Sequence, residues 1–183
     1  MSEILCHGLG ANFLFEPDCT VEGVGGQDTK AIKTLNGKPA DFIMNDKCSA
    51  GTGKFLEISA GRLGLELSEI YKTARKNPAI KLSPYARYLP RASSLSANGA
   101  EMREIAYDTL DSSAHKLASL IKRLENKIYF LSGGLSNVPL FKQLLGEHLG
   151  AEIFTHENAI YCGAMGASLI GARKANEILK ETR

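Results

Sequence analysis

Three features of membrane-bound or secreted proteins are missing from this sequence of 183 residues. The opening residues MSEILCHGLG lack the basic and then apolar regions of a signal peptide, and no apolar run is long enough to span a bilayer. A disulfide framework is not indicated either, because the four cysteines are widely and unequally spaced. We therefore expect a cytoplasmic protein with no membrane partner, whose thiols are free, bind metal, or act as small buried hydrophobic groups. The cysteines are Cys6, Cys19, Cys48 and Cys162.

Charge of one sign is not concentrated anywhere in the chain. Twenty-two Lys and Arg residues against twenty Asp and Glu residues give a formal net charge of +2, without the long basic block that tracks nucleic acid. Nucleic acid is therefore not an expected partner. A hydrophobic content of 44% is ordinary for a protein that buries a core, so we predict a single globular domain over residues 1–183.

The pattern of apolar residues predicts an α/β protein whose regular structure opens with three antiparallel strands, over residues 20–24, 29–35 and 41–44. Later apolar segments predict strands over 127–131 and 152–155, while 77–99 reads as an irregular connection because its periodicity fades. No element is predicted before residue 20. Helical spacing and break signals predict five helices, over residues 54–63, 67–75, 102–124, 138–149 and 163–179.

The turn between the first two strands consists of Gly25, Gly26, Gln27 and Asp28. Two glycines leave backbone amides accessible to phosphate oxygens, Asp28 suits Mg²⁺, and Gln27 could orient a water molecule. A plain hairpin turn explains the same residues. A second Gly-Gly pair lies in SGGLSN, after a predicted strand and before a helix, which is a position that favours anions and nucleotides.

In that second turn the sequence leaves two readings open. Gly133 and Gly134 permit close approach of a ligand, but Ser136 or Asn137 could simply cap the following helix. A different segment, GTGK, is not a Walker loop, because Cys48 stands at the required first Gly and Phe55 at the required Ser or Thr.

Cys48 precedes a small-residue turn that starts a helix, a setting whose dipole stabilises a thiolate or an anionic iron-sulfur cluster. Cys6 is a possible partner. Two thiolates do not fill the four sites of a typical cluster, so a cluster would need Cys19 and Cys162 as well, or a second copy of the chain. His7, next to Cys6, is expected to be a capping or surface residue.

Five segments occur in a fixed order along the chain: CHGLGA, TVEGVGGQDTKAI, FIMNDKCSAGTGKFLE, LSGGLSN and YCGAMGASL. Together they resemble the CoA-substrate-specific activase family, the BadF/BadG-type ATPases that activate 2-hydroxyacyl-CoA dehydratases and benzoyl-CoA reductases. The resemblance is most specific in NDKCSAGTGKFLE and spans most of the chain outside residues 77–99. It implies an actin-like (ribonuclease H-like) ATPase subdomain, with a mixed sheet and flanking helices.

The resemblance also implies a function. Members bind ATP or ADP with Mg²⁺ and work as homodimers that share one 4Fe-4S cluster, whose ligands match Cys6 and Cys48. ATP gates the transfer of one electron from the cluster to the dehydratase, and a ferredoxin or flavodoxin resupplies the electron. The remaining matches are Gly25, Gly26, Gln27 and Asp28 on the phosphate side and Gly133, Gly134 and Asn137 on the adenosine side.

Three departures from the family pattern qualify this expectation. Nothing resembles the family's first phosphate loop, DxGSTxTK, so we expect the second half of an actin-like ATPase that is truncated or split over two chains. Gly23 stands where the family has an acidic residue that helps to place magnesium. Residues 81–97 lack family motifs linked to subunit or partner contacts.

These departures leave two other classes of function open. One is a non-catalytic nucleotide-binding or regulatory module of the same fold, which the missing phosphate loop and Gly23 favour. The other is a sugar-kinase-like or acetate-kinase-like phosphotransferase, which the two Gly-Gly turns would also suit, although the cysteine motif argues against it.

Overall fold

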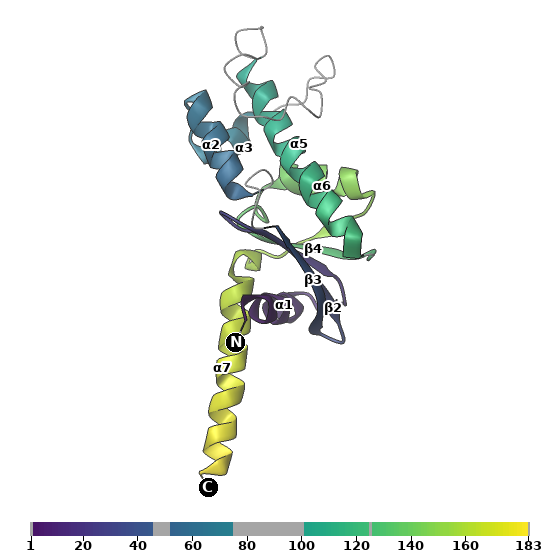
Figure 1. The fold of residues 1–183 in the computed structure, drawn as a ribbon. Helices are drawn as coiled ribbons and strands as arrows, with labels where there is room; N and C mark the ends of the chain where they lie inside the picture. The colour runs from purple at the N-terminus through teal and green to yellow at the C-terminus, as the bar shows by residue number, and fades with distance from the viewer. Residues whose placement is uncertain (1, 46–51, 75–100, 125, 183) are drawn as a thin grey trace.

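The fold is a five-stranded mixed sheet between two layers of helices (Figure 1). A computed structural model describes residues 2–45, 52–74, 101–124 and 126–182. The strands are β1 (Thr20–Val24), β2 (Thr29–Leu35), β3 (Lys38–Asn45), β4 (Tyr129–Gly133) and β5 (Ile153–Phe154). The α-helices are α1 (Glu3–Leu14), α2 (Gly53–Leu63), α3 (Leu67–Thr73), α5 (Met102–Ile121), α6 (Pro139–Leu149) and α7 (Cys162–Glu181), with short 3-10 turns η3 (Lys122–Leu124) and η4 (Ala159–Tyr161).

The sheet has the strand order β3-β2-β1-β4-β5. Strands β1, β2 and β3 form the expected antiparallel meander, and β1 is parallel to β4, as β4 is to β5. The turn between β2 and β3 has positive φ at both Asn36 and Gly37, as an Asn-Gly hairpin turn requires. Because β1 and β4 are parallel, the two Gly-Gly turns that follow them lie at the same edge of the sheet.

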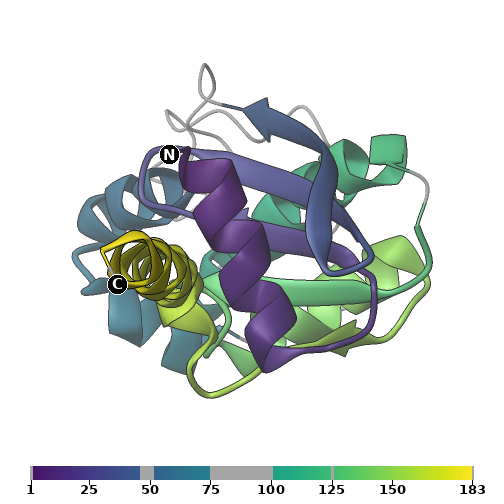
Figure 2. The same ribbon diagram turned by 90° about the horizontal axis from the view of Figure 1, so that it is seen from below.

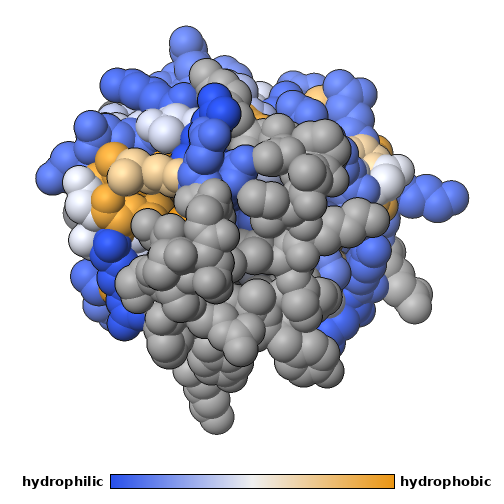
Figure 3. Space-filling model, turned by 90° about the horizontal axis from the view of Figure 1, so that it is seen from above, coloured by the Kyte–Doolittle hydropathy of each residue, from blue (hydrophilic) through white to orange (hydrophobic). Residues whose placement is uncertain are grey.

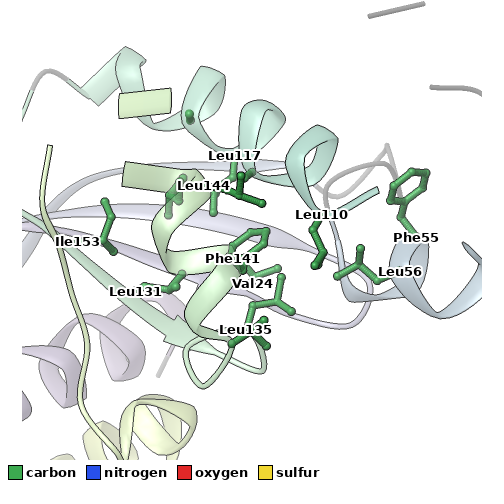
Figure 4. Close-up of a cluster of buried hydrophobic side chains, with 14 of the residues drawn as sticks. Val24, Phe55, Leu56, Leu110, Leu117, Leu131, Leu135, Phe141, Leu144 and Ile153 are labelled. Atoms are coloured by element: carbon green, nitrogen blue, oxygen red, sulfur yellow. The ribbon is translucent and has the colours of Figure 1, made fainter. Parts of the chain in front are cut away.

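One face of the sheet is covered by α2, α3, α5 and α6, which enclose the larger hydrophobic core (Figure 4). Val24 and Leu131 point into this core from the sheet, and Leu110, Leu117 and Phe141 meet them from α5 and α6. The helix ends are well specified, since α3 and α5 start with capping boxes and α2 ends at Gly64 in the left-handed region.

The opposite face is covered by α1 and α7. Figure 2 shows α1 lying across the sheet, whereas α7 is seen nearly along its axis and so projects away from it. Alternate strand residues Val21, Ile32 and Phe130 form a smaller core here with Ala11 of α1 and Cys162 of α7. From Gly171 onward α7 is exposed to solvent.

Glu22 places a carboxyl group within the larger, otherwise hydrophobic core. Its neighbours in register are Ala31 on β2 and Leu131 on β4, and its side chain is fully buried. Neither carboxylate oxygen has a hydrogen-bond partner on another residue of the described structure. Burial therefore raises the pKa of Glu22 well above its usual value, with only its own backbone amide opposing the shift.

Most predicted elements are confirmed within a few residues. Strand β4 was expected over 127–131 and lies two residues later, at Tyr129–Gly133, whereas β3 starts three residues before its expected position. Helix α5 ends three residues earlier than expected, and α1 was not predicted. The segment 77–99, expected to be an irregular connection, lies entirely outside the described residues. Seen from above, the coloured surface is mostly hydrophilic, with an apolar area at one side (Figure 3). None of the helices in the described ranges combines the length and apolar character of a membrane-spanning segment.

Candidate nucleotide-binding site

The hairpin tip between β1 and β2 is a tight turn closed by a hydrogen bond from the Gly25 amide to the Asp28 carbonyl, at 3.0 Å. The Asp28 carboxylate folds back over this turn, so that a Cβ on Gly25 would overlap it and the carboxylate would have to move. Gly25 therefore makes room for the Asp28 side chain in this turn. Gly26 is different, because a Cβ there would meet nothing within 4 Å, and Gln27 beside it is exposed. Gly26 is thus not explained by the packing of the described chain.

Helix α2 begins directly against this hairpin. The amides of Gly53 and Lys54 donate to the carbonyls of Gly25 and Gly26, at 2.9 and 2.7 Å. The first amides of α2 therefore hold the hairpin. Two of the terminal amide donors of α2 therefore already have protein acceptors, and the expected effect of the α2 dipole on Cys48 stays a prediction. Cys48 lies outside the described residues.

The turn after β4 lies beside the hairpin. Its Gly134 amide donates to the carbonyl of Val24, the last residue of β1, at 3.3 Å. Gly133 has φ +82°, and a Cβ on it would lie 2.6 Å from that same carbonyl oxygen, so only glycine fits. Gly134, like Gly26, faces open space.

The interpretation of Ser136 or Asn137 as a helix cap is wrong. Helix α6 has Val138 as its N-cap, without a side-chain hydrogen bond, and Pro139 at its first position. Ser136 instead donates from Oγ to the Gly133 carbonyl at 2.7 Å, which closes the glycine turn. Asn137 is exposed, so its side chain remains available to a ligand.

Lys30 is a charged residue of this region that the sequence reasoning missed. Its side chain is only 4% exposed, and its Nζ lies 2.9 Å from Asp28 Oδ2 and also pairs with Glu3 of α1. Burial lowers the pKa of Lys30, but the hydrogen bonds to Glu3 and Asp28 outweigh burial and raise it. The available signal was a lysine at the second position of a strand, on the same face as the apolar Ile32.

His7 is neither a cap nor a surface residue, contrary to expectation. It is 8% exposed, and its Nε2 lies 2.7 Å from Oγ of Ser132, which donates to the carbonyl of Glu22. Burial and the nearby Lys30 lower the pKa of His7 to about 4, so it is neutral at pH 7. Gly23 lies against both groups, since a Cβ there would be 2.9 Å from Lys30 Cγ and 3.0 Å from His7 Nε2.

The cysteines differ in setting. Cys19 and Cys162 are almost fully buried in the smaller core, and burial raises the pKa of each thiol to about 12. Both therefore behave as small hydrophobic residues. Cys6 is 6% exposed in α1. In the part of the chain that the structure describes, no three His, Cys, Asp or Glu side chains form a group that could hold a metal ion.

Of the predicted site residues, the structure brings Gly25, Gly26 and Asp28 together with Gly133 and Gly134, at the carboxyl ends of β1 and β4. Ligands of open α/β sheets bind at this edge. Among the described residues, nothing lies within 4 Å of a Cβ placed on Gly26 or Gly134, so both leave open space there. The arrangement fits a nucleotide held by backbone groups.

The BadF/BadG/BcrA/BcrD ATPase family matches residues 1–171. The chain belongs to this family. Protein YjiL of Escherichia coli K12, which has no assigned function, is 38% identical over 178 residues, which are 94% of this chain and 69% of that protein. The (R)-2-hydroxyglutaryl-CoA dehydratase activating ATPase of Acidaminococcus fermentans is 34% identical over 179 residues, which are 96% of this chain and 69% of that protein.

A solved structure gives the same result for the fold. The activator of the 2-hydroxyisocaproyl-CoA dehydratase from Clostridium difficile with bound ADPNP superposes with a TM-score of 0.90 and 29% identity, over 100% of this chain and 70% of that one. The expected fold class, an actin-like ATPase subdomain with a mixed sheet and flanking helices, is confirmed.

Proposed function

We propose that this family member is an ATP-dependent activator of a 2-hydroxyacyl-CoA dehydratase or a related CoA-ester reductase. The observation that carries the proposal is the meeting of two Gly-Gly turns at one sheet edge, in a chain of an ATPase family. Relatives with 34% and 31% identity are named as activators of such dehydratases. The proposal takes residues 1–183 as one domain, equivalent to the second half of an actin-like ATPase, and as cytoplasmic.

In this proposal the hairpin holds the phosphates of ATP or ADP. The amides near Gly26 approach phosphate oxygens, Asp28 helps to hold Mg²⁺, and Gln27 orients water. The turn at Gly133, Gly134 and Asn137 lies on the adenosine side. The support is geometric: Gly26 and Gly134 face open space, and the side chains of Gln27 and Asn137 are exposed beside them.

The iron-sulfur part of the proposal depends on more than the described residues. A 4Fe-4S cluster needs four ligands, and the described residues of one chain supply Cys6 alone as a candidate, so they do not fit a complete cluster. The cluster would require Cys48 and the same two thiols from a second copy, as a homodimer. It would supply one-electron transfer to the dehydratase, with a ferredoxin or flavodoxin as donor.

A second candidate is a non-catalytic nucleotide-binding module of the same fold. The observation that favours it is Gly23, which places no carboxylate beside the hairpin, so Asp28 has no acidic neighbour at that position for holding Mg²⁺. This candidate keeps nucleotide binding but lacks electron transfer.

Two measurements on anaerobically prepared protein separate these candidates. Calorimetry with MgADP and MgATP tests the nucleotide site, and iron content with visible absorption tests the cluster. Four irons per dimer in the wild type, lost in Cys6→Ser and Cys48→Ser and kept in Cys19→Ser, would support the activator. Nucleotide binding by a colourless, iron-free protein would support the binding module, and absence of nucleotide binding would overturn both.

A further inference from the structure

Lys30 links the hairpin tip between β1 and β2 to helix α1. It lies on β2 with its side chain on the α1 side of the sheet, where Nζ reaches Asp28 at the hairpin tip and Glu3 in the first turn of α1. Asp28 is 29% exposed and Glu3 is 69% exposed, but Lys30 itself is only 4% exposed. One buried ammonium group therefore pairs with two carboxylates from separate elements.

A buried ammonium group is costly unless carboxylates or other acceptors surround it. Lys30 depends on Glu3 and Asp28 together, because its remaining surroundings are the sheet and α1. If one carboxylate is drawn away, the other has to compensate more of the charge. The strength of the Lys30–Glu3 pair is thus tied to what Asp28 binds.

The space for this arrangement comes from Gly23. A Cβ at that position would lie 2.9 Å from Lys30 Cγ, and an acidic side chain there would place a third carboxylate beside Lys30. His7, on the other side of the same gap, is held by Ser132 and is neutral at pH 7, so it does not compete for either carboxylate. The absence of a side chain at Gly23 thus leaves Lys30 to bridge Asp28 and Glu3.

We propose that Lys30 is a positioning residue that couples occupation of the hairpin site to the hold on helix α1, which carries Cys6. The inference rests on the proposed function, because it takes the hairpin as the Mg-nucleotide site. If Asp28 held the magnesium ion of a bound nucleotide, its carboxylate would pair less strongly with Lys30, and Lys30 would pair more strongly with Glu3. Ligand binding would therefore tighten the first turns of α1.

Hydrogen–deuterium exchange of the α1 amides in the full chain, with and without MgATP, tests this coupling. In the wild type, MgATP should slow exchange over residues 5–11 about fivefold or more, the usual lower range of coupling between sites. Glu3→Gln, at an exposed position compatible with folding, should remove this slowing, as should Lys30→Met. Lys33→Met, on the same strand, is the matched control and should keep it.

A variant without nucleotide separates this inference from the proposed function. Asp28→Asn removes one of the two carboxylates that pair with Lys30 and should by itself slow the exchange of the α1 amides. Adding Glu3→Gln to the same chain should cancel this effect. If MgATP does not bind, the proposed function fails, but the Asp28→Asn result still decides the bridge. Unchanged α1 exchange in Asp28→Asn, or slowing that persists in Glu3→Gln, would overturn the coupling.

Discussion

Gly10 of α1 and Gly166 of α7 bring the backbones of these helices into direct contact. A Cβ on Gly10 would overlap the carbonyl oxygen of Cys162, and a Cβ on Gly166 would overlap the carbonyl oxygen of Cys6. Neither neighbour is a flexible side chain that could give way. The α1–α7 crossing therefore requires that Gly10 and Gly166 have no Cβ atom, and the position of Cys6 depends on this crossing.

Gly10→Ala should destabilise the protein by about 1–3 kcal/mol, because the added methyl group forces the two helices apart. Urea unfolding followed by circular dichroism measures the change. Gly171→Ala is the matched control on the exposed part of α7, where a Cβ meets nothing within 4 Å. It should stabilise by about 0.5–1 kcal/mol through helix propensity. Equal effects of both substitutions would contradict the close crossing.

The adjacent glycines after β4 should respond differently to alanine. Gly133→Ala should lower stability by about 1–3 kcal/mol, because it strains a positive φ and contacts the Val24 carbonyl. Gly134→Ala should leave stability within about 0.5 kcal/mol, as an exposed substitution, but weaken MgADP binding about tenfold or more. Thermal melts and calorimetry on both variants check this. Unchanged affinity in Gly134→Ala would remove that residue from the site.

Glu22→Gln should remove part of the pH dependence of stability. The folded pKa of Glu22 is raised above the ordinary value of 4.5, so the folded state keeps a proton that the unfolded state releases. Wild-type stability should therefore fall as pH rises from 4.5 towards the raised pKa, with a slope of up to about 1.4 kcal/mol per pH unit. The Gln side chain does not titrate, so the Glu22→Gln variant should be more stable than the wild type at pH 8.

Urea unfolding at pH 5 and pH 8 measures this difference. Glu16→Gln is the control, because it makes the same change of side chain at an exposed position and should change stability by no more than about 0.5 kcal/mol. Because other groups titrate over the same range, the quantity to compare is the difference between each variant and the wild type. Identical pH profiles for Glu22→Gln and the wild type would show that Glu22 is not buried in its protonated form.

The thiols of Cys19 and Cys162 should resist alkylation in the native protein. Burial raises the pKa of both thiols to about 12, so at pH 8 they are protonated and unreactive. Burial also keeps the reagent away from them. Iodoacetamide labelling followed by peptide mass spectrometry should find both unmodified in buffer and both modified in urea. Rapid native labelling of either would mean that the smaller core is more open than described and would restore these cysteines as ligand candidates.

Local chemistry made much of the fold predictable. The strands of the meander are separated by turns that Gly25 and Asn36-Gly37 mark in the sequence. The end of α2 is marked by a single residue, Gly64. Helix α1 was missed because Gly8 and Gly10 have low helix propensity, and the helix depends on its tertiary contact with α7 instead. Strand β4 was placed two residues early, because its end is set by pairing Gly133 with Val24.

The candidate site, like the fold, was predictable where local sequence determines it and unpredictable where tertiary contacts do. The sequence indicated both Gly-Gly turns, but not which glycines the turns need for themselves, since that depends on Val24 and Asp28 lying against them. The bridge from Asp28 through Lys30 to Glu3 joins residues 25 positions apart and follows from the pairing of α1 with the sheet. No local pattern encodes such a contact.

The two faces of the sheet should differ in resistance to local opening. Among the described residues, twenty-two buried side chains form the core beneath α5 and α6, but only seven form the core beneath α1 and α7. Regions with few buried apolar contacts open at a lower free energy than the whole molecule unfolds. Helices α1 and α7, which contact each other at Gly10 and Gly166, should therefore move together against the sheet while the meander and both glycine turns remain folded. They would form the movable layer of a rigid nucleotide-binding framework.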